Sequence, residues 1–331
     1  MYWYTTADLR LRLTREGSKR FMSHGVNQDT VYALAATQDF AHDGLCFAAR
    51  HSGLWRTDNG GERWQKIEDI PGVSDGLPVT AVVVSPGFRS DGTVFAAVHG
   101  GILRSNDGGN RWELVALSSP APVVSVLAVS PNFEVDGVVL AATLEDGIFR
   151  SDDRGATWQA WNIGLFDLRV LSIALSPAFA HDRTVYVGVE SGIFCSRNGG
   201  RAWQETDFSD EHAPVLSLAL SPRFAHDGVL FAGTESSGLF YSQDRGQTWQ
   251  RTLDGEAINT ILLSPGFPAA PEMLAVLGDT LWLSHDGGQT WSKRDHTRGP
   301  GVGYTAAVAP HGFAPESRLL LGLSDGQIVW T

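Results

Sequence analysis

Short apolar runs alternate with polar turns along the whole chain, and one unit shows their order. Residues 216–220 (LSLAL) form a small and apolar run, residues 221–228 (SPRFAHDG) a turn, and residues 229–233 (VLFAG) an almost wholly apolar run. After a short turn come residues 239–241 and then a more polar stretch that starts at Trp249. No segment shows a convincing helical period. Apolar runs this short, bounded by turn residues, predict four antiparallel β-strands per unit.

Two motifs mark repeats of this unit. The first, Ser/Thr-x-Asp/Asn-x-Gly-x-x-Trp, is called the box, and its copies end 42–48 residues apart at Trp64, Trp112, Trp158, Trp203, Trp249 and Trp291. The second, Ser-Pro-x-Phe, is called the marker and ends at Phe88, Phe133, Phe179, Phe224 and Phe267, with degenerate copies that end at Phe40 and Phe313. Seven markers predict seven repeats.

The box has the composition of a tight turn with an apolar anchor. Its Asp or Asn can accept hydrogen bonds from nearby backbone N–H groups, its Gly adopts a positive φ without strain, and its Ser or Thr hydroxyl adds a local bond. The Trp then opens the next strand and buries a large surface. We therefore predict a structural role for the box Trp residues and for the box Asp and Asn residues, which are Asn59, Asp107, Asp153, Asn198, Asp244 and Asp286.

Four short antiparallel strands that repeat at this spacing are typical of a β-propeller blade. We predict an all-β, seven-bladed propeller of four-stranded antiparallel blades that spans residues 1–331 as one domain. The last repeat stops at Thr331, at the Ser position of a seventh box, so blade 7 lacks a fourth strand. Because an unpaired edge is a liability, we predict that an N-terminal strand pairs with the C-terminal strands. Blade 7 would then be shared between about residues 8–25 and 304–331.

One ambiguity concerns the stretch that closes the ring. Residues 14–21 (TREGSKRF) resemble a worn box, whereas residues 9–13 (LRLRL) resemble a strand. The latter compete with residues 327–331 for the third-strand position. Which N-terminal stretch forms the closing strand therefore stays open.

Composition permits a large core and gives an acidic surface. Hydrophobic residues make up 43% of the 331 residues, charged residues 19%, and the net charge is −12. The acidic balance argues against nucleic acid or an anionic membrane as the main partner. Cys46 and Cys195 lie in apolar runs of different repeats, which favours two buried free thiols. The N-terminus has no apolar h-region, and no run approaches the roughly 20 residues of a membrane span, so we expect a cytoplasmic protein.

The boxes resemble the Asp-box, or BNR, repeats of sialidases, sortilin-type receptors, oligoxyloglucan hydrolases and the photosystem II assembly factor family. The resemblance covers essentially the whole chain and implies the fold, but not one function, because these relatives include hydrolases, receptors and assembly factors. Sialidases have six blades and an Arg-Ile-Pro motif, which this chain lacks. Oligoxyloglucan hydrolases place their acid and base between two propellers. The single seven-bladed ring of the assembly factors is the best architectural match.

One face of the predicted ring carries acidic turns. In a propeller, the turns between second and third strands share a face with the links between blades, opposite the markers and boxes. The polar residues of these turns are His51, His99, Glu145, Asp146, Glu190, Glu235, Asp279 and Asp325. They are either polar residues in exposed turns or a ring of carboxylates and imidazoles that binds a cation or a polar ligand.

The links between blades vary most in sequence. Trp161 and Phe166 in one link, and Phe208 in the next, are candidates for an apolar rim that binds a peptide or a sugar. The alternative is that Trp161 and Phe166 pack between blades.

The sequence suggests neither a metal nor a cofactor. His42, His181 and His226 recur in Ala-His-Asp turns, but each belongs to a different blade, too far from the others to share one ion. They lack the spacing of a zinc site. The chain has no P-loop or Rossmann fingerprint. We expect no metal and no cofactor.

The favoured function is a non-catalytic binding or scaffold propeller that holds a protein partner on the inter-blade-loop face. It rests on the missing enzymatic signatures and on the best architectural relative. The alternative is a glycan-active hydrolase that uses two carboxylates of the same face as acid and base. Its candidate pairs would come from Glu145, Glu190, Glu235, Asp279 and Asp325. The expected partner is thus a protein or a glycan, and whether any catalysis occurs stays open.

Overall fold

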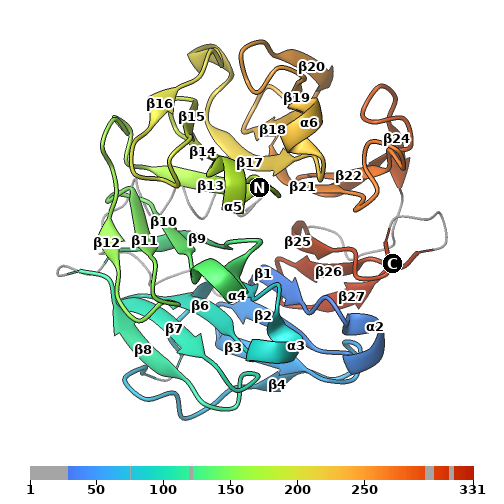
Figure 1. Cartoon of the computed structure of the whole chain (residues 1–331). Helices are drawn as coiled ribbons and strands as arrows, with labels where there is room; N and C mark the ends of the chain where they lie inside the picture. Colours follow the sequence, from blue (N-terminus) through green and yellow to red (C-terminus); the bar gives the residue numbers. More distant parts are fainter. Residues whose placement is uncertain (1–28, 75, 119–121, 256, 295–301, 313–316) are drawn as a thin grey trace, which may run out of the picture.

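Seven antiparallel sheets are arranged in a ring around a central axis (Figure 1). The computed structural model describes residues 29–74, 76–118, 122–255, 257–294, 302–312 and 317–331. Within these residues six sheets have four strands and the seventh has three, and in every sheet the strands pair in chain order. The predicted all-β, seven-bladed propeller is confirmed.

The first four blades follow one another along the chain. Blade 1 comprises β1 (Val31–Ala36), β2 (Cys46–Arg50), β3 (Gly53–Thr57) and β4 (Gln65–Lys66). Blade 2 comprises β5 (Val79–Val84), β6 (Val94–Val98), β7 (Gly101–Ser105) and β8 (Glu113–Ala116). Blade 3 comprises β9 (Val124–Val129), β10 (Val139–Thr143), β11 (Ile148–Ser151) and β12 (Gln159–Ala160). Blade 4 comprises β13 (Val170–Leu175), β14 (Val185–Val189), β15 (Ile193–Ser196) and β16 (Gln204–Glu205).

The remaining three blades complete the ring. Blade 5 comprises β17 (Val215–Leu220), β18 (Leu230–Thr234), β19 (Leu239–Ser242) and β20 (Gln250–Leu253). Blade 6 comprises β21 (Ile258–Leu263), β22 (Met273–Leu277), β23 (Thr280–Ser284) and β24 (Ser292–Arg294). Blade 7 comprises β25 (Tyr304–Val308), β26 (Leu320–Leu323) and β27 (Ile328–Trp330).

Five marker turns contain a single helical turn, which the sequence reading treats as plain turns. These helices are α2 (Phe40–Asp43), α3 (Phe88–Asp91), α4 (Phe133–Asp136), α5 (Phe179–Asp182) and α6 (Phe224–Asp227). In α6 the final Asp227 accepts a bond from the Ser221 hydroxyl at 2.6 Å and from the Val229 N–H at 3.0 Å. The buried Phe224 anchors the other end. The marker Ser and Phe therefore hold the turn, and the Asp stabilises its exit.

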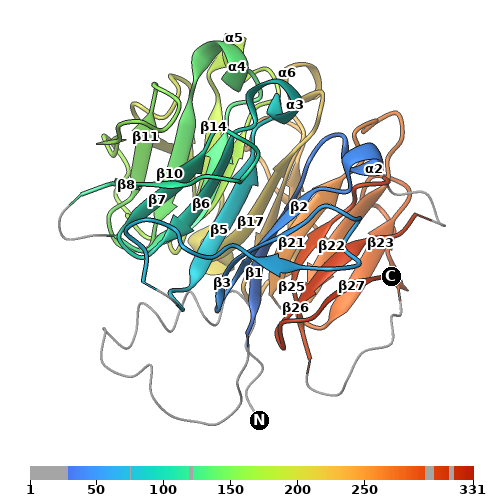
Figure 2. The same cartoon turned by 90° about the horizontal axis from the view of Figure 1, so that it is seen from below.

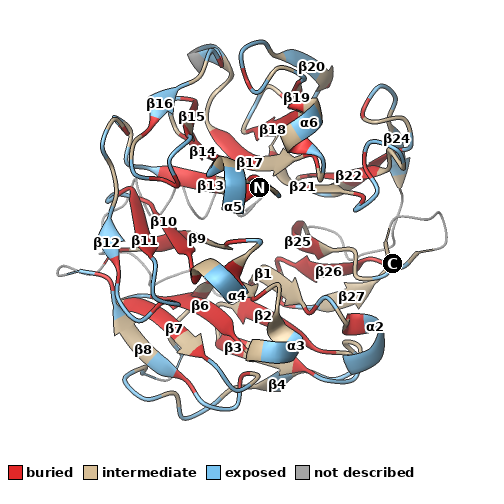
Figure 3. Ribbon diagram, in the orientation of Figure 1, coloured by how far each residue is buried: buried red, intermediate tan, exposed pale blue. Residues whose placement is uncertain are grey.

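The core lies between neighbouring blades. All five residues of β6 are buried, because other blades cover both faces of the sheet (Figure 3). Phe95 of this strand lies edge to face with Phe133 of the next blade, with 5.8 Å between ring centroids. Trp158, the box Trp of that next blade, belongs to the same cluster. The box Trp thus contributes to the seam between blades, since such rings bury a large apolar surface.

Hydroxyl groups of the innermost strands tie successive blades together. Each donates to a carbonyl oxygen of the next blade's first strand: Thr80 to Val124 at 2.8 Å, Ser125 to Val170 at 2.6 Å, Ser172 to Val215 at 3.1 Å and Ser217 to Ile258 at 2.7 Å. These bonds join the first strands of successive blades directly, so they hold neighbouring blades together near the central axis.

The seam between blades 7 and 1 has contacts like those of the other seams. β1 lies against β25, and the Thr30 hydroxyl donates to the Ser324 carbonyl oxygen at 2.9 Å. The Trp330 indole N–H donates to the Gly60 carbonyl oxygen, in the blade 1 box, at 2.9 Å. At the equivalent box position in blade 5, the Arg245 carbonyl accepts from Tyr186 of blade 4. The ring is therefore closed by packing, while the predicted closing segment of residues 8–25 lies outside the described residues.

The two cysteines differ in burial, although both are free thiols. Cys46 is fully buried, and burial raises the pKa of its thiol to about 12. Cys195 is half-buried, because the outer side of β15 is only partly covered. The prediction of two buried thiols is thus right for Cys46 and wrong for Cys195.

Candidate functional site

Markers and boxes lie on one face, joined by a recurrent backbone bond. The residue after the box Asp or Asn donates its N–H to the carbonyl oxygen of the marker-turn exit. The pairs are Gly60 and Gly44, Gly108 and Gly92, Arg154 and Gly137, Gly199 and Arg183, Arg245 and Gly228, and Gly287 and Pro271. In the edge-on view the helical turns gather at one face of the ring (Figure 2). The turns between second and third strands, with the acidic residues, lie at the opposite ends of the same strands.

The box is a saturated hydrogen-bond network. In blade 5 the Ser242 hydroxyl donates to Asp244 at 2.8 Å and accepts the Gly246 N–H at 2.8 Å. Asp244 also accepts from the Thr248 hydroxyl at 2.6 Å and the Thr248 N–H at 2.8 Å. The Thr248 hydroxyl, together with these backbone donors, lowers the pKa of Asp244 to about 2. A carboxylate held in this way caps a turn and is a poor proton donor.

The two boxes with Asn make the same turn without the charge. Asn198 accepts from the Ser196 hydroxyl and from the Ala202 N–H, both at 2.9 Å. Asn59 accepts from the Thr57 hydroxyl at 2.8 Å and from the Arg63 N–H at 3.0 Å. The acceptor oxygen, rather than the negative charge, is therefore what the turn geometry requires.

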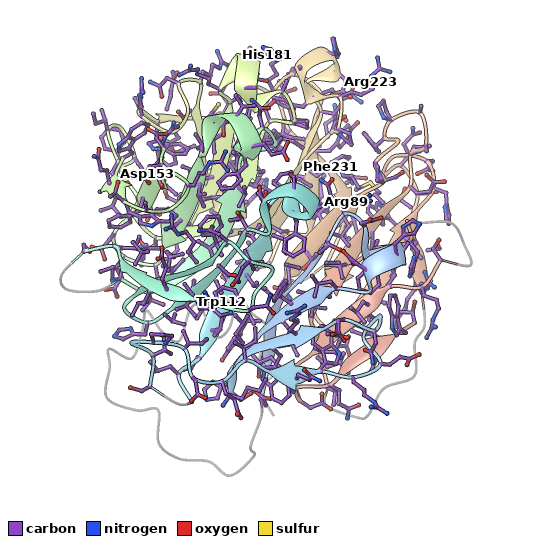
Figure 4. All side chains as sticks on the ribbon, turned by 60° about the horizontal axis from the view of Figure 1, so that its bottom comes forward. Arg89, Trp112, Asp153, His181, Arg223 and Phe231 are labelled. Atoms are coloured by element: carbon purple, nitrogen blue, oxygen red, sulfur yellow. The ribbon has the colours of Figure 1, made fainter. Side chains whose placement is uncertain are left out.

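The histidines of the Ala-His-Asp turns lie at the surface of the marker face. His42 pairs with Asp39 at 2.8 Å, and its side chain is mostly exposed. His181 and His226 are exposed on separate blades, and Figure 4 shows His181 and Arg223 at the outer surface of their turns. Asp182, beside His181, accepts from the Ser176 hydroxyl at 2.6 Å. The structure does not bring the three imidazoles together.

The acidic turns of the opposite face are spread one to a blade. Glu145 and Asp146 are exposed, as are His99 and Asp279, whereas His51, Glu190, Glu235 and Asp325 are half-buried. Glu190 pairs with Arg169 at 2.6 Å, and the His51 ring nitrogen bonds the Tyr32 hydroxyl at 3.1 Å. Asp325 accepts from the backbone N–H and the side-chain amide of Gln327. These contacts are local to neighbouring turns and strands.

Phe208 is not part of an exposed rim, which corrects the prediction from sequence. It is only 5% exposed and lies against Trp249 and Phe240, with centroid separations of 5.1 and 5.4 Å. The short 3-10 helix η1 (Asp210–His212) turns this link back towards the blade. His212 then stacks on Phe240 at 4.6 Å. The link between blades 4 and 5, which carries Phe208, therefore covers an aromatic cluster and does not form an exposed rim.

Trp161 packs in the seam between blades 3 and 4. Its ring lies under the guanidinium groups of Arg150 at 4.4 Å and Arg201 at 5.1 Å. Its carbonyl oxygen accepts from the indole N–H of Trp203 at 2.8 Å. Trp161 therefore follows the packing alternative, and the cation–π contacts explain its position.

Phe166, in the same link, faces solvent. It is 88% exposed, and two further apolar residues of the link, Ile163 and Leu168, are 75% and 36% exposed. We call these three residues the link patch. Three of the four exposed large hydrophobic residues of the described chain lie in it. Sequence reasoning missed Ile163 and Leu168, although the residues 161–169 (WNIGLFDLR) carried the signal as an apolar-rich run without a strand's alternation.

The link that carries the patch is held by bonds at both ends. The Trp203 N–H donates to the Ile163 carbonyl oxygen at 2.8 Å, and the Gly147 N–H donates to the Leu168 carbonyl oxygen at 3.0 Å. Asn162 bonds the Ile148 N–H and the Asp146 carbonyl oxygen. Leu165 is buried between the exposed residues. The backbone is thus anchored while Ile163 and Phe166 point away from the core.

Two Gly-x-Ser-x-Gly stretches, residues 72–76 and 322–326, share the spacing of hydrolase nucleophile elbows. Ser324 lies in the turn between β26 and β27, not between a strand and a helix. Its hydroxyl accepts the Gly303 N–H at 3.1 Å, and the residue is buried. The strand-to-helix context that exposes a nucleophile is therefore missing at this serine.

Within the described residues, no group of three or more His, Cys, Asp and Glu side chains has an arrangement that could hold a metal ion. In the same part of the chain, no helix is both long and apolar enough to cross a bilayer.

Comparison with known families and structures agrees with this architecture. The model of the BNR/Asp-box repeat matches residues 240–251 and 282–293. None of the curated protein sequences compared with the chain matches it. Among solved structures, YCF48 bound to D1 peptide is 16% identical, with a TM-score of 0.68 and 95% of both chains covered.

Two further similar structures are larger proteins. The GH74 xyloglucanase from Xanthomonas campestris is 18% identical, with a TM-score of 0.67. The matched region covers 90% of this chain and 51% of the xyloglucanase. The extracellular domain of the putative one component system BT4673 from B. thetaiotaomicron is 17% identical, with a TM-score of 0.68. The matched region covers 92% of this chain and 38% of that domain. Likeness at this identity concerns the fold alone. The chain is a seven-bladed β-propeller built from BNR/Asp-box repeats.

Proposed function

We propose that this propeller is a non-catalytic binding protein that engages a protein partner with its inter-blade loops, through the link patch of Ile163, Phe166 and Leu168. The observation that carries the proposal is the 88% exposure of Phe166 on an anchored link. Burying such a side chain is worth about 1.5–3 kcal/mol. In the next link the equivalent aromatic side chain, that of Phe208, is buried, whereas the side chain of Phe166 stays in contact with solvent.

The anchoring bonds favour recognition by a partner. Because the link is bonded at Ile163 and at Leu168, the patch is pre-organised and loses little conformational freedom on binding. Clustered exposed apolar residues with a polar surround are typical of protein–protein contact sites. The similarity in fold to a propeller solved with a bound peptide supports this reading by analogy.

The hydrolase alternative has support only from the similarity in fold to xyloglucanases. Its candidate carboxylates, Glu145, Glu190, Glu235, Asp279 and Asp325, stand in turns of five different blades. Glu190 is neutralised by Arg169 at 2.6 Å. A retaining or inverting mechanism needs two carboxyl groups about 5–10 Å apart around one bond. An assay for reducing ends released from xyloglucan would detect this activity.

The test of partner binding compares three forms of the full chain as baits in the native host. Phe166→Ser removes the central anchor. Val135→Ser is the matched control, since Val135 is also a highly exposed apolar residue, at 80%, but lies outside the link patch, on α4 of the marker face. We expect wild type and Val135→Ser to recover the same stoichiometric partner, and Phe166→Ser to recover about tenfold less. Equal recovery by all three baits would exclude the link patch. A cytoplasmic location remains a prediction, which fractionation of the same cells tests.

A further inference from the structure

We propose that the partner segment bound at the link patch is cationic and carries at least one large apolar side chain. This inference rests on the proposed function and adds the chemistry of the partner. It follows from the charges that surround Phe166.

The charges at the Leu168 end of the patch are mostly negative. The Gly147 N–H donates to the Leu168 carbonyl oxygen, and the Asp146 carbonyl accepts from Asn162, so the turn with Glu145 and Asp146 lies directly beside the link. Both carboxylates are on exposed residues. They are therefore available to a bound segment without the rupture of an existing ion pair in the described residues.

The one arginine at this end is already engaged. Arg169 pairs with Glu190 at 2.6 Å and with Asp167 at 3.7 Å, while Asp167 also accepts the Ser191 N–H at 2.9 Å. This end of the patch thus carries four carboxylates, those of Glu145, Asp146, Asp167 and Glu190, and the guanidinium group of Arg169 pairs with only the last two. The local excess of negative charge attracts a basic segment and repels an acidic one.

The other end of the patch is different and sets a direction. Ile163 forms a bridge with Ala202, next to Arg201, whose guanidinium covers the Trp161 ring at 5.1 Å. This arginine is exposed. A bound segment would place its apolar side chain at Phe166 and Ile163 and its lysine or arginine residues towards Glu145 and Asp146. The net charge of −12 adds a general attraction between the whole protein and a basic partner.

The first arm of the test identifies the bound segment. The photo-cross-linking residue p-benzoylphenylalanine replaces Phe166 in the full chain expressed in the native host, and replaces Val135 in a control. After irradiation, mass spectrometry identifies the cross-linked peptide. We expect position 166, but not position 135, to capture a segment with net positive charge and a large apolar residue. An acidic or uncharged segment at position 166 would overturn this inference and leave partner binding intact.

Other outcomes of this arm separate the two proposals. Absence of any cross-link above the Val135 control would overturn the proposed function itself. A cross-link from position 166 to residues 9–15 of the same chain, which are basic and partly apolar, would assign the patch to an internal contact and overturn both.

The second arm measures the charge dependence with defined probes. One fluorescent 12-residue peptide contains lysine, glycine, one leucine and one phenylalanine, and its counterpart has glutamate in place of lysine. We expect only the lysine peptide to bind, with affinity that falls as salt is added and is roughly tenfold weaker in Glu145→Gln/Asp146→Asn and in Phe166→Ser. Equal melting temperatures would show that the variants are folded. Binding of the glutamate peptide, or an unchanged affinity in the charge variant, would refute a cationic ligand.

Discussion

The backbone N–H of Arg245 donates to the carbonyl oxygen of Gly228 at 3.0 Å, while Arg245 is held at a φ of 63°. The corresponding residue is glycine in four of the six boxes, Gly60, Gly108, Gly199 and Gly287. Arginine at this φ is strained, because its Cβ crowds the backbone. The side chain gains contacts in return: its guanidinium lies 5.7 Å from the Phe224 ring and donates to the Ala225 carbonyl oxygen at 2.7 Å. The box and marker are thus joined by both main chain and side chain.

This relationship predicts an order of stability for two variants. Arg245→Ala retains the strained φ and loses the contacts of the guanidinium, whereas Arg245→Gly loses the contacts but also relieves the strain. We expect the free energy of unfolding of Arg245→Gly to exceed that of Arg245→Ala by about 1 kcal/mol. Urea unfolding followed by tryptophan fluorescence measures both. An alanine variant as stable as the glycine variant would show that the backbone is not strained at this residue.

We predict that the box aspartates make the free energy of unfolding fall in acid. Hydrogen bonds from the Thr248 and Thr290 hydroxyls, with nearby backbone N–H groups, lower the pKa of Asp244 and Asp286 to about 2, against about 3.9 in an unfolded chain. Between these values the unfolded state binds more protons, so stability rises with pH. The contribution is complete above pH ~4 and is lost as pH falls towards ~2.

Asparagine at these positions removes the charge and retains an acceptor, as in the native box of Asn198. In Asp244→Asn/Asp286→Asn we expect the urea midpoint to fall less steeply between pH 5 and pH 2 than in wild type. Asp58→Asn, at an exposed box residue that accepts none of these bonds, is the control and should match wild type. Parallel profiles for all three proteins would contradict the prediction.

Phe208 and Phe166 should respond in opposite ways to the same substitution. Phe208→Ala leaves a cavity among Trp249, Phe240 and His212, and should lower the free energy of unfolding by about 3–5 kcal/mol. Phe166→Ala removes a ring that is 88% exposed, and should change it by less than about 0.5 kcal/mol. Thermal and urea unfolding of the two variants test the contrast. Similar losses in both would mean that Phe166 is buried in solution.

The prediction that an N-terminal strand completes blade 7 can be tested by deletion of that segment. We expect residues 8–25 to supply its fourth strand, since β27 has no outer neighbour among the described residues. A chain that begins at residue 26 should then melt several degrees lower, and a synthetic peptide of residues 8–25 should restore the melting temperature. A peptide with the same composition in scrambled order is the control. An unchanged melting temperature after deletion would place the fourth strand elsewhere.

The fold was predictable because its causes are local and repeated. Each box carries its own acceptor, glycine and tryptophan, and the five full markers each carry a Ser, a Pro and a Phe, so the turns form from residues that are neighbours in sequence. The spacing of 42–48 residues then indicates the number of blades. The helical turns in five of the markers escaped prediction, because a single turn of four residues has no periodicity to detect.

The sequence by itself determined the seven repeats, the all-β blades and the turn-forming role of the boxes. Only the tertiary structure decided that Phe208 is buried, that Phe166 is exposed and that Glu190 is neutralised by Arg169. In both links an aromatic residue stands among polar ones, and no local pattern separates the two cases. The difference arises because Phe240 and Trp249, far from Phe208 in sequence, offer it an apolar neighbourhood. Burial of a link residue depends on what the adjacent blade presents, which only the assembled ring specifies.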